Sequence, residues 1–200
     1  MTGIPARPAR PARPAQATPR ASQRTSRTAR AAPTLYLVRH AKAESREGWE
    51  AADSERPLTR RGHEQARVIA GHLVDLVGRR PARVLSSPAT RCRDTVVPLA
   101  AASGLDVVEA RWLSEGSEPE HAFDQLRKLT AHLDPPSGVG GPVVACTHGD
   151  VIWGILERLA RLSVDLGPNP DAPKGGVWII KNAAGDAVDV TLYRPDVVRA

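Results

Sequence analysis

The sequence has little cysteine, few aromatic residues and no long apolar segment. Its two cysteines, Cys92 and Cys146, cannot build a disulfide framework, and this scarcity favours a cytoplasmic protein. No run of apolar residues reaches the length of a membrane span and no secretory signal is recognisable, so we expect no association with a membrane. Aromatic residues make up 4% of the chain, which is compatible with a globular fold.

Acidic residues are absent from residues 1–33, which contain seven arginines and almost no large apolar side chains. Such a segment cannot bury enough surface to fold by itself. Its closely spaced prolines also interrupt any amphipathic helix of the kind found in organellar transit peptides. We predict a disordered tail rich in arginine, proline and alanine over residues 1–33, or a start site set too far upstream.

The positive charge of the chain belongs to this tail. Subtracting its seven arginines from the formal net charge of +6 leaves about −1 for residues 34–200. A basic chain suggests nucleic-acid binding, but here the charge does not follow a folded face. We therefore expect no nucleic-acid binding by the folded part, with a nucleic-acid-binding tail as an alternative. Residues 34–200 have the length of one domain.

Short apolar segments alternate with helical patterns from residue 34 onward. In the helical patterns, apolar residues recur every three to four positions. The expected strands are 34–38, 83–86, 106–110, 142–146, 176–180 and 188–193, and the expected helices are 59–77, 89–103, 119–133 and one that follows Gly149. This alternation predicts an α/β fold, a three-layer α/β/α sandwich with a mostly parallel central sheet.

Two histidines directly follow predicted strands. His40 comes after the segment 34–38, and His148 comes after 142–146. Ligands of parallel sheets bind beyond the carboxyl ends of the strands, so we predict that both imidazoles open onto one crevice. Either histidine alone would more often be a structural residue. The helix after Gly149 adds N–H groups that favour an anion near His148.

Two arginines are placed to bind an anion at the same edge of the sheet. Arg39 precedes His40, and Arg91 lies in the first turn of a predicted helix, where its side chain can point back to the edge while Arg93 points elsewhere. A guanidinium group pairs with phosphate oxygens in a bidentate manner. The pattern indicates a phosphate site, although Arg91 taken alone could be a solvated surface charge.

Four short motifs occur in an order that is typical of one family. They are Arg39-His40-Ala41, Leu58-Thr59-Arg60-Arg61-Gly62, Ser86-Ser87-Pro88 followed by Arg91, and Thr147-His148-Gly149. With these motifs the chain resembles the histidine phosphatase (phosphoglycerate mutase-like) superfamily. Its compact length is similar to the SixA branch and to the phosphatase domain that follows the Nudix domain in some bacterial MutT-type hydrolases. Ala41 departs from the Gly of many members, which we interpret as a mild constraint on backbone approach.

The resemblance implies a metal-independent phosphatase that uses no cofactor. His40 would accept the phosphoryl group and form a phosphohistidine that water later hydrolyses. Arg39, Arg91 and His148 would surround the transferred group and stabilise the charge on its oxygens in the transition state.

A general acid for the leaving group is also implied by the resemblance, in the segment after the third strand. Glu115 is the first candidate by position, and Glu118 and Glu120 are its alternatives. If the substrate is a phosphohistidine or an anhydride, a dedicated acid is less necessary.

Four further basic residues are candidates for contact with the rest of a substrate. Arg56 and Lys174 are the tentative substrate-binding residues, whereas Lys42 and Arg46 are more simply explained as surface charges. The substrate is expected to be a phosphorylated small molecule or a phosphoprotein, including a phosphohistidine protein. A catalytically silent phosphate-binding module is the alternative to an enzyme. Mutase activity is disfavoured, because the loops are too short for a capping insertion.

Overall fold

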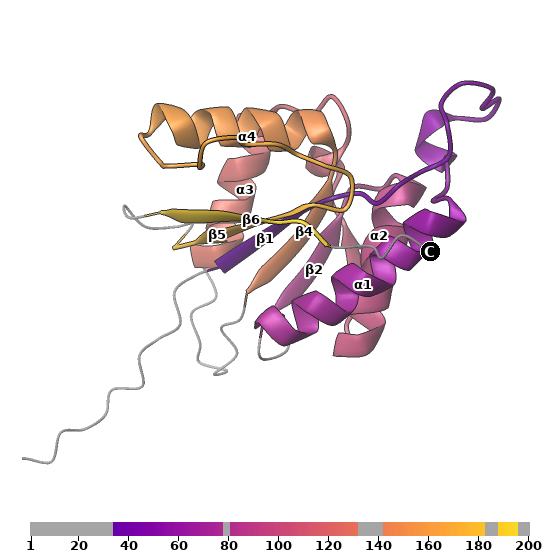
Figure 1. Cartoon of the computed structure of the whole chain (residues 1–200), viewed down its shortest axis with the longest axis horizontal. Helices are drawn as coiled ribbons and strands as arrows, with labels where there is room; N and C mark the ends of the chain where they lie inside the picture. Colours follow the sequence, from indigo (N-terminus) through magenta and orange to yellow (C-terminus); the bar gives the residue numbers. More distant parts are fainter. Residues whose placement is uncertain (1–33, 78–80, 132–141, 183–187, 196–200) are drawn as a thin grey trace, which may run out of the picture. The chain divides into compact units, whose positions relative to one another are not determined.

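A computed structural model of the chain describes residues 34–77, 81–131, 142–182 and 188–195 (Figure 1). The strands in this part are β1 (Thr34–Arg39), β2 (Arg83–Ser86), β3 (Val107–Glu109), β4 (Val143–Thr147), β5 (Val177–Lys181) and β6 (Asp189–Tyr193). The helices are α1 (Arg60–Val77), α2 (Thr90–Ser103), α3 (Pro119–Ala131) and α4 (Gly149–Arg161), with short 3-10 turns η1 (Asp53–Glu55) and η2 (Arg111–Leu113).

The predicted strands and helices are confirmed to within a few residues, and only the 3-10 turns were not expected. The predicted tail, residues 1–33, lies outside the described residues. So do the last two residues of the predicted helix 119–133 and most of the turn before β6. No helix in the described ranges is long and apolar enough to cross a membrane.

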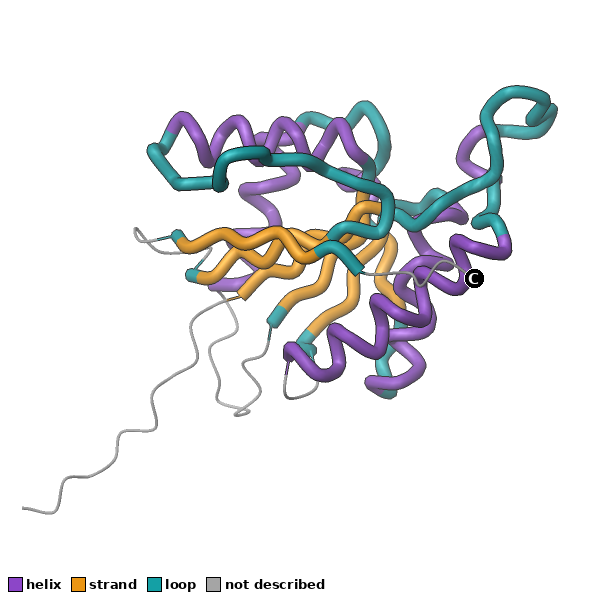
Figure 2. The backbone as a smooth tube through the Cα atoms, in the orientation of Figure 1, coloured by secondary structure: helices purple, strands orange, loops and turns teal. Residues whose placement is uncertain are grey.

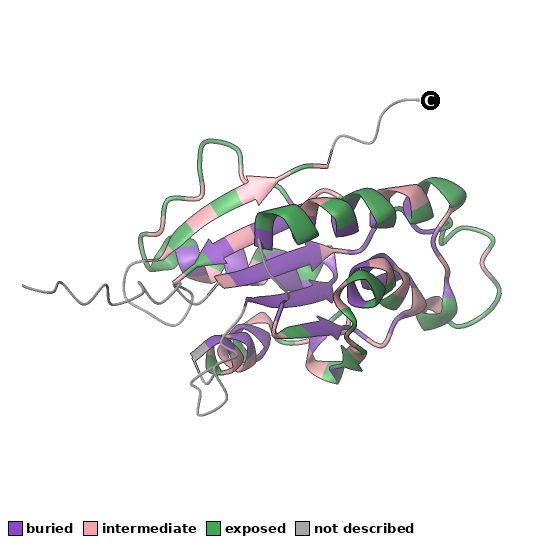
Figure 3. Cartoon of the chain, turned by 90° about the horizontal axis from the view of Figure 1, so that it is seen from below, coloured by how far each residue is buried: buried purple, intermediate pink, exposed green. Residues whose placement is uncertain are grey.

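The strands bury side chains on both faces of the sheet because helices cover both. On β1, Leu35 and Leu37 pack in the cluster that includes α3 and α4, whereas Tyr36 and Val38 pack in the cluster that includes α1 and α2. Alternate side chains of a strand point to opposite faces, so an unbroken apolar run needs cover on both sides. Figure 3 shows the central strands as buried and the helices with one exposed face each. The predicted α/β/α sandwich is therefore confirmed.

The sheet is mixed, which corrects the expectation of a mostly parallel sheet. Its strand order is β3-β2-β4-β1-β5-β6, with parallel pairing from β3 to β1 and antiparallel pairing of β1 with β5 and of β5 with β6. The reason is the path of residues 162–176, which contain no helix and run from the end of α4 back toward the sheet (Figure 2). The chain therefore enters β5 beside the carboxyl end of β1, where Arg39 N donates to Gly176 O at 3.0 Å, and runs in the opposite direction.

Helix ends follow the capping rules. Gly62 N donates to Thr59 Oγ1 at 3.0 Å, so Thr59 caps the start of α1 as its sequence position predicts. Gly104 ends α2 in the left-handed region with φ of 60°. The starts of α1 and α2, and not the Gly104 end, lie at the edge of the sheet where His40 and Arg91 are found, since Thr59 N donates to Lys42 O and Ser87 N to Cys146 O.

A pair of glycine substitutions tests the packing of α4 on α3. A Cβ added at Gly154 would lie 2.2 Å from Pro119 Cγ, whereas nothing lies within 4 Å of a Cβ added at Gly71 in α1. We expect Gly154→Ala to lower the free energy of unfolding by about 1–3 kcal/mol through overpacking. Gly71→Ala should raise it by roughly 0.5–1 kcal/mol through helix propensity. Guanidinium denaturation measures both, and similar effects of the two substitutions would contradict this description of the interface.

Candidate active site

His40 lies at the carboxyl end of β1 with its ring almost fully buried. Its backbone N–H donates to Thr147 O at 3.1 Å, and its exposed fraction is 6%. The ring Nδ1 lies 2.8 Å from Ala41 O. A carbonyl can only accept, so Nδ1 carries the proton and Nε2 of the neutral ring keeps a free lone pair.

The surroundings of His40 keep its imidazole neutral. Burial is the main cause that lowers the pKa of His40 from 6.5 to about 3, and the positive charges of His148, Arg91 and Arg39 lower it further, against an opposing contribution from the hydrogen bond to the Ala41 carbonyl. At neutral pH the ring is thus an unprotonated base facing a cationic environment.

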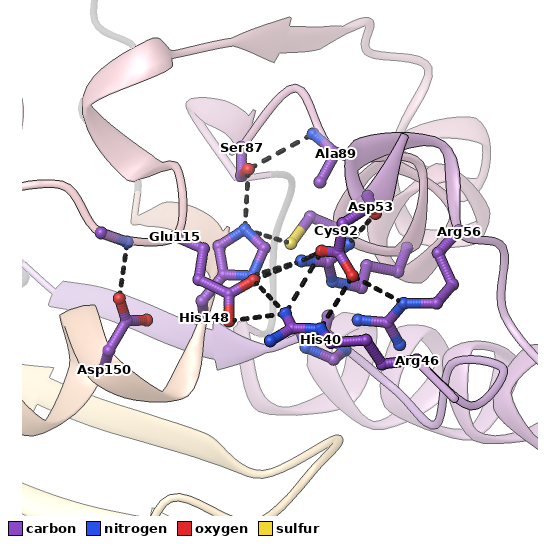
Figure 4. A network of polar contacts seen from close by, with 12 residues as sticks. His40, Arg46, Asp53, Arg56, Ser87, Ala89, Cys92, Glu115, His148 and Asp150 are labelled. Atoms are coloured by element: carbon purple, nitrogen blue, oxygen red, sulfur yellow. Dashed lines mark hydrogen bonds and ion pairs between the residues drawn. The ribbon is translucent and has the colours of Figure 1, made fainter. Parts of the chain in front are cut away.

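His148 stands next to His40, as the sheet-edge rule predicts. The two ring centroids are 5.4 Å apart with an interplanar angle of 63° (Figure 4). Nε2 of His148 is 2.9 Å from Ser87 Oγ and 3.5 Å from Cys92 Sγ, and its Nδ1 is 3.4 Å from a terminal nitrogen of Arg91. Because the guanidinium can only donate, Nδ1 of the neutral ring accepts and Nε2–H points to Ser87. Ser87 and Cys92 thus contact the ring of His148, which the sequence motifs did not predict.

Arg91 enters the crevice from the first turn of α2 and is 1% exposed. Its Nη1 donates to Asp53 O at 2.6 Å, and its Nη2 lies 2.7 Å from Glu115 Oε2 and 2.9 Å from Asp53 Oδ2. Arg93 points away and pairs with Glu109 of β3 at 3.4 Å, as the helical spacing predicts.

Arg39 reaches the same place across the start of α4. A Cβ added at Gly149 would lie 2.9 Å from the Arg39 guanidinium carbon, so the absence of a side chain at Gly149 makes this close approach possible. Nη1 of Arg39 donates to Ala172 O.

Arg39 and Arg91 each bury an Nε–H group that has no hydrogen-bond partner among the described residues. A buried donor left unpaired costs about 1–3 kcal/mol, and such a group calls for a functional explanation. Two unpaired guanidinium donors beside two imidazoles, at the start of a helix, fit an anion with several oxygens.

Asp53 is a member of the site that sequence reasoning missed. Its Oδ1 accepts from Nε of Arg46 and Nε of Arg56, both at 3.0 Å, and its Oδ2 faces Arg91 (Figure 4). Burial by itself would raise the pKa of Asp53, but hydrogen bonds from Arg56 and Arg46 and the charge of Arg91 bring it well below its ordinary value. Asp53 lies in the irregular segment 41–57, which carried no motif that could have indicated it.

Glu115, the first candidate for the general acid, lies against Arg91 and near His148. Its Oε2 is 2.7 Å from Arg91 Nη2, 3.1 Å from Arg46 Nη2 and 3.9 Å from His148 Nδ1. Arg46, expected to be a surface charge, therefore contacts the site. Of the two alternatives, Glu120 pairs with Arg161 near the far end of α4.

The loop of Glu115 is fastened to the segment that carries His148. Gly116 N donates to Asp150 Oδ2 at 2.6 Å, and Thr147 Oγ1 donates to Leu113 O at 2.6 Å. Asp150 was not identified from the sequence, where an acid in the first turn of a helix is explained by the helix dipole alone.

Arg56 and Lys174 border the site in different ways. Arg56 is 6% exposed, and its Nη1 donates to Glu44 O at 2.7 Å. Its guanidinium therefore holds the backbone of the loop before α1. Lys174 is exposed and precedes Gly175, whose N–H donates to His40 O at 3.1 Å. Within the described ranges, no group of three or more His, Cys, Asp or Glu side chains is arranged to hold a metal ion.

Comparison with known proteins gives one family. The model of the histidine phosphatase superfamily (branch 1) matches residues 35–128. A curated relative, the 8-oxo-(d)GTP phosphatase of Mycolicibacterium smegmatis, is 26% identical over 162 residues, which are 81% of this chain and 48% of the relative. The chain thus spans about half the length of that relative.

Solved structures share this fold. The SixA phosphohistidine phosphatase assigned in Agrobacterium tumefaciens superposes with a TM-score of 0.65 at 24% identity, over 82% of this chain and 99% of that one. The protein histidine phosphatase SixA in complex with tungstate gives 0.57 at 21% identity, over 80% and 94% of the two chains. The motif order and the strand order thus agree with the match of residues 35–128 to the histidine phosphatase superfamily (branch 1).

Proposed function

We propose that residues 34–200 form a phosphatase domain that hydrolyses a phosphorylated substrate through a phosphohistidine on His40. The observation that carries this proposal is the hydrogen bond from His40 Nδ1 to Ala41 O, which leaves Nε2 as a neutral, buried nucleophile beside two guanidinium groups with unpaired N–H donors. A phosphoryl group needs a nucleophile with a free lone pair and positive charge around its oxygens.

The reaction proceeds in two steps. His40 Nε2 forms a bond to phosphorus while the bond between phosphorus and the leaving group breaks, at an oxygen in an ester or anhydride and at a nitrogen in a phosphohistidine. A water molecule then attacks the phosphohistidine, which releases inorganic phosphate and restores the neutral imidazole. Arg39 and Arg91 donate to the phosphoryl oxygens and, with His148 beside them, stabilise the charge of the transition state, in the place that a metal ion takes in other phosphoryl-transfer sites.

Glu115 is the proposed general acid. Its Oε2 lies 2.7 Å from Arg91 Nη2 and 3.1 Å from Arg46 Nη2, so the carboxyl group stands beside the place where a phosphoryl group bound to Arg91 would lie. From there Glu115 can pass a proton to the leaving oxygen. The contact with Arg91 supports Glu115 as the acid over Glu118 and Glu120.

The substrate is proposed to be a phosphorylated small molecule or a phosphohistidine protein. The names of the relatives support both, since one is an 8-oxo-(d)GTP phosphatase and others are SixA phosphatases. Arg56 and Lys174 are proposed to lie along the path of the substrate. Two free thiols, Cys92 and Cys146, suit a cytoplasmic location.

Replacing the nucleophile tests the proposal directly. His40→Ala should lower kcat for p-nitrophenyl phosphate by roughly 10³-fold or more, because no other group can form the covalent intermediate. His63→Ala, at an exposed position on α1, is the matched control and should keep wild-type activity. Rapid alkaline quench with ³²P-labelled substrate, which preserves the acid-labile phosphohistidine, should trap labelled protein in the wild type, and the His40→Ala variant should carry no label. Wild-type turnover by His40→Ala would refute the mechanism, and phosphate binding without turnover or trapping would favour a silent binding module.

The neutrality of His40 predicts a pH dependence of stability. The folded pKa of about 3 lies below the unfolded value of 6.5, so between these values the unfolded chain binds a proton that the native chain does not. Stability from this group is present above pH 6.5 and is lost as the pH falls toward 3. The difference in unfolding free energy between wild type and His40→Gln should shrink by roughly 1 kcal/mol per pH unit between pH 6 and 4. Urea denaturation at several pH values measures it, and a constant difference would mean that His40 is protonated in the native state.

The role of Glu115 predicts a dependence on the leaving group. Glu115→Gln should slow hydrolysis of an alkyl phosphate by about 10²-fold, because an alkoxide needs a proton to leave, and should slow p-nitrophenyl phosphate hydrolysis much less. Glu118→Gln is the control, since Glu118 is exposed and was an alternative acid. Steady-state kcat/KM over a series of leaving groups provides the measurement. A parallel drop for all substrates would show that Glu115 does not act as the acid.

A further inference from the structure

The turn of residues 173–176 is fastened to the end of β1, beside the proposed nucleophile. Gly175 N donates to both Arg39 O at 3.2 Å and His40 O at 3.1 Å. Gly175 has a φ of +78°, in the region that glycine adopts without strain. Lys174 is therefore fixed in sequence and space next to His40, on a turn that cannot easily move away from it.

Lys42 lies against the same turn from the other direction. Its N–H donates to Gln65 Oε1 at 2.9 Å, and its carbonyl accepts from Thr59 N at 2.9 Å. A Cβ added at Gly175 would lie 3.6 Å from the amide carbon of Gln65. The Gln65 side chain, which accepts from Lys42 N, thus lies next to the turn that carries Lys174.

The cations around His40 fall into two groups with different partners. Arg46, Arg56 and Arg91 are ion-paired with Asp53 or Glu115. In the described part of the chain, Lys42 and Lys174 have no ion pair with a carboxylate.

The positive charges on the lysine side are close enough to repel one another. Burial is the largest cause that lowers the pKa of Lys174, followed by the charges of Arg39, Arg56, Lys42 and Arg91. Arg39 contributes an unpaired buried Nε–H to the same side. An anion there would relieve the repulsion and supply the missing acceptor.

The two sides of the crevice would treat a second negative group of the substrate differently. On the side of Arg91, the carboxylates of Asp53 and Glu115 repel it. On the side of Lys174, neither lysine is ion-paired with a carboxylate of the described residues, so their ammonium groups are available to attract it. The electrostatics therefore direct an anionic substituent toward the lysines.

We infer that Lys42 and Lys174 form a subsite for a second phosphate adjacent to the transferred one, so that the preferred substrates are diphosphates and not simple monoesters. This inference rests on the proposed function and specifies its substrate class. The chemistry of the two steps is unchanged. The second phosphate stays with the leaving group when the bridging P–O bond breaks.

The test compares inorganic phosphate with methylenediphosphonate, whose P–C–P link cannot be hydrolysed, as ligands of the full chain by isothermal titration calorimetry. In the wild type, methylenediphosphonate should bind about tenfold or more tightly than phosphate. In the double variant Lys42→Met with Lys174→Met, the loss of methylenediphosphonate affinity should exceed the loss of phosphate affinity by about tenfold. Lys181→Met is the matched control, because it removes a lysine of β5 that is paired with Asp189 of β6, and it should preserve the preference.

Several outcomes would overturn the subsite. Equal binding of the two anions by the wild type contradicts it. An equal loss of affinity for both anions in the double variant contradicts it as well, because that would indicate only a general electrostatic attraction. The conservative double variant Lys42→Arg with Lys174→Arg should restore most of the preference, and thermal unfolding confirms that each variant is folded. If neither anion binds, the proposed phosphatase function fails as well, which separates that failure from a loss of preference alone.

Discussion

The pairing of β1 with β4 is the constraint on which the site depends. Arg39 is in register with Thr147, and the next residue, His40, donates its backbone N–H to the Thr147 carbonyl. Parallel neighbours end at the same edge, so one hydrogen-bonded register sets the two imidazoles edge to face with their centroids 5.4 Å apart. The buried apolar side chains of both strands hold that register, since a shift by one residue would reverse every face.

Around this pair, the protein balances a dense set of charges. Asp53 and Glu115 neutralise Arg91 and its neighbours, which makes it possible to bury a guanidinium that is 1% exposed. The balance is incomplete, because Nε–H groups of Arg39 and Arg91 stay unpaired among the described residues. The site is thus stable without a ligand and still retains donors that an oxyanion can satisfy.

Much of the fold follows from local patterns in the sequence. Each strand and helix was predictable because apolar periodicity and capping residues such as Thr59 and Gly104 act over short distances. The antiparallel direction of β5 was not predictable, because it depends on where the irregular residues 162–176 return to the sheet.

The same division holds for the site. His40, His148 and Arg91 were predictable from strand ends and helical phase. Asp53 was not, because its contacts with Arg91 join residues 38 positions apart through a loop without a motif. The anchor of Asp150 on the Glu115 loop likewise depends on how two distant segments meet, which no periodicity records.

The segment from Thr147 to Asp150 has a mechanical consequence. It carries the His148 imidazole, and its two neighbouring side chains hold the loop of Glu115 through hydrogen bonds of 2.6 Å. Loss of either hydrogen bond would therefore release the loop of Glu115, whereas His148 would stay next to His40, because the register of β1 with β4 holds it there.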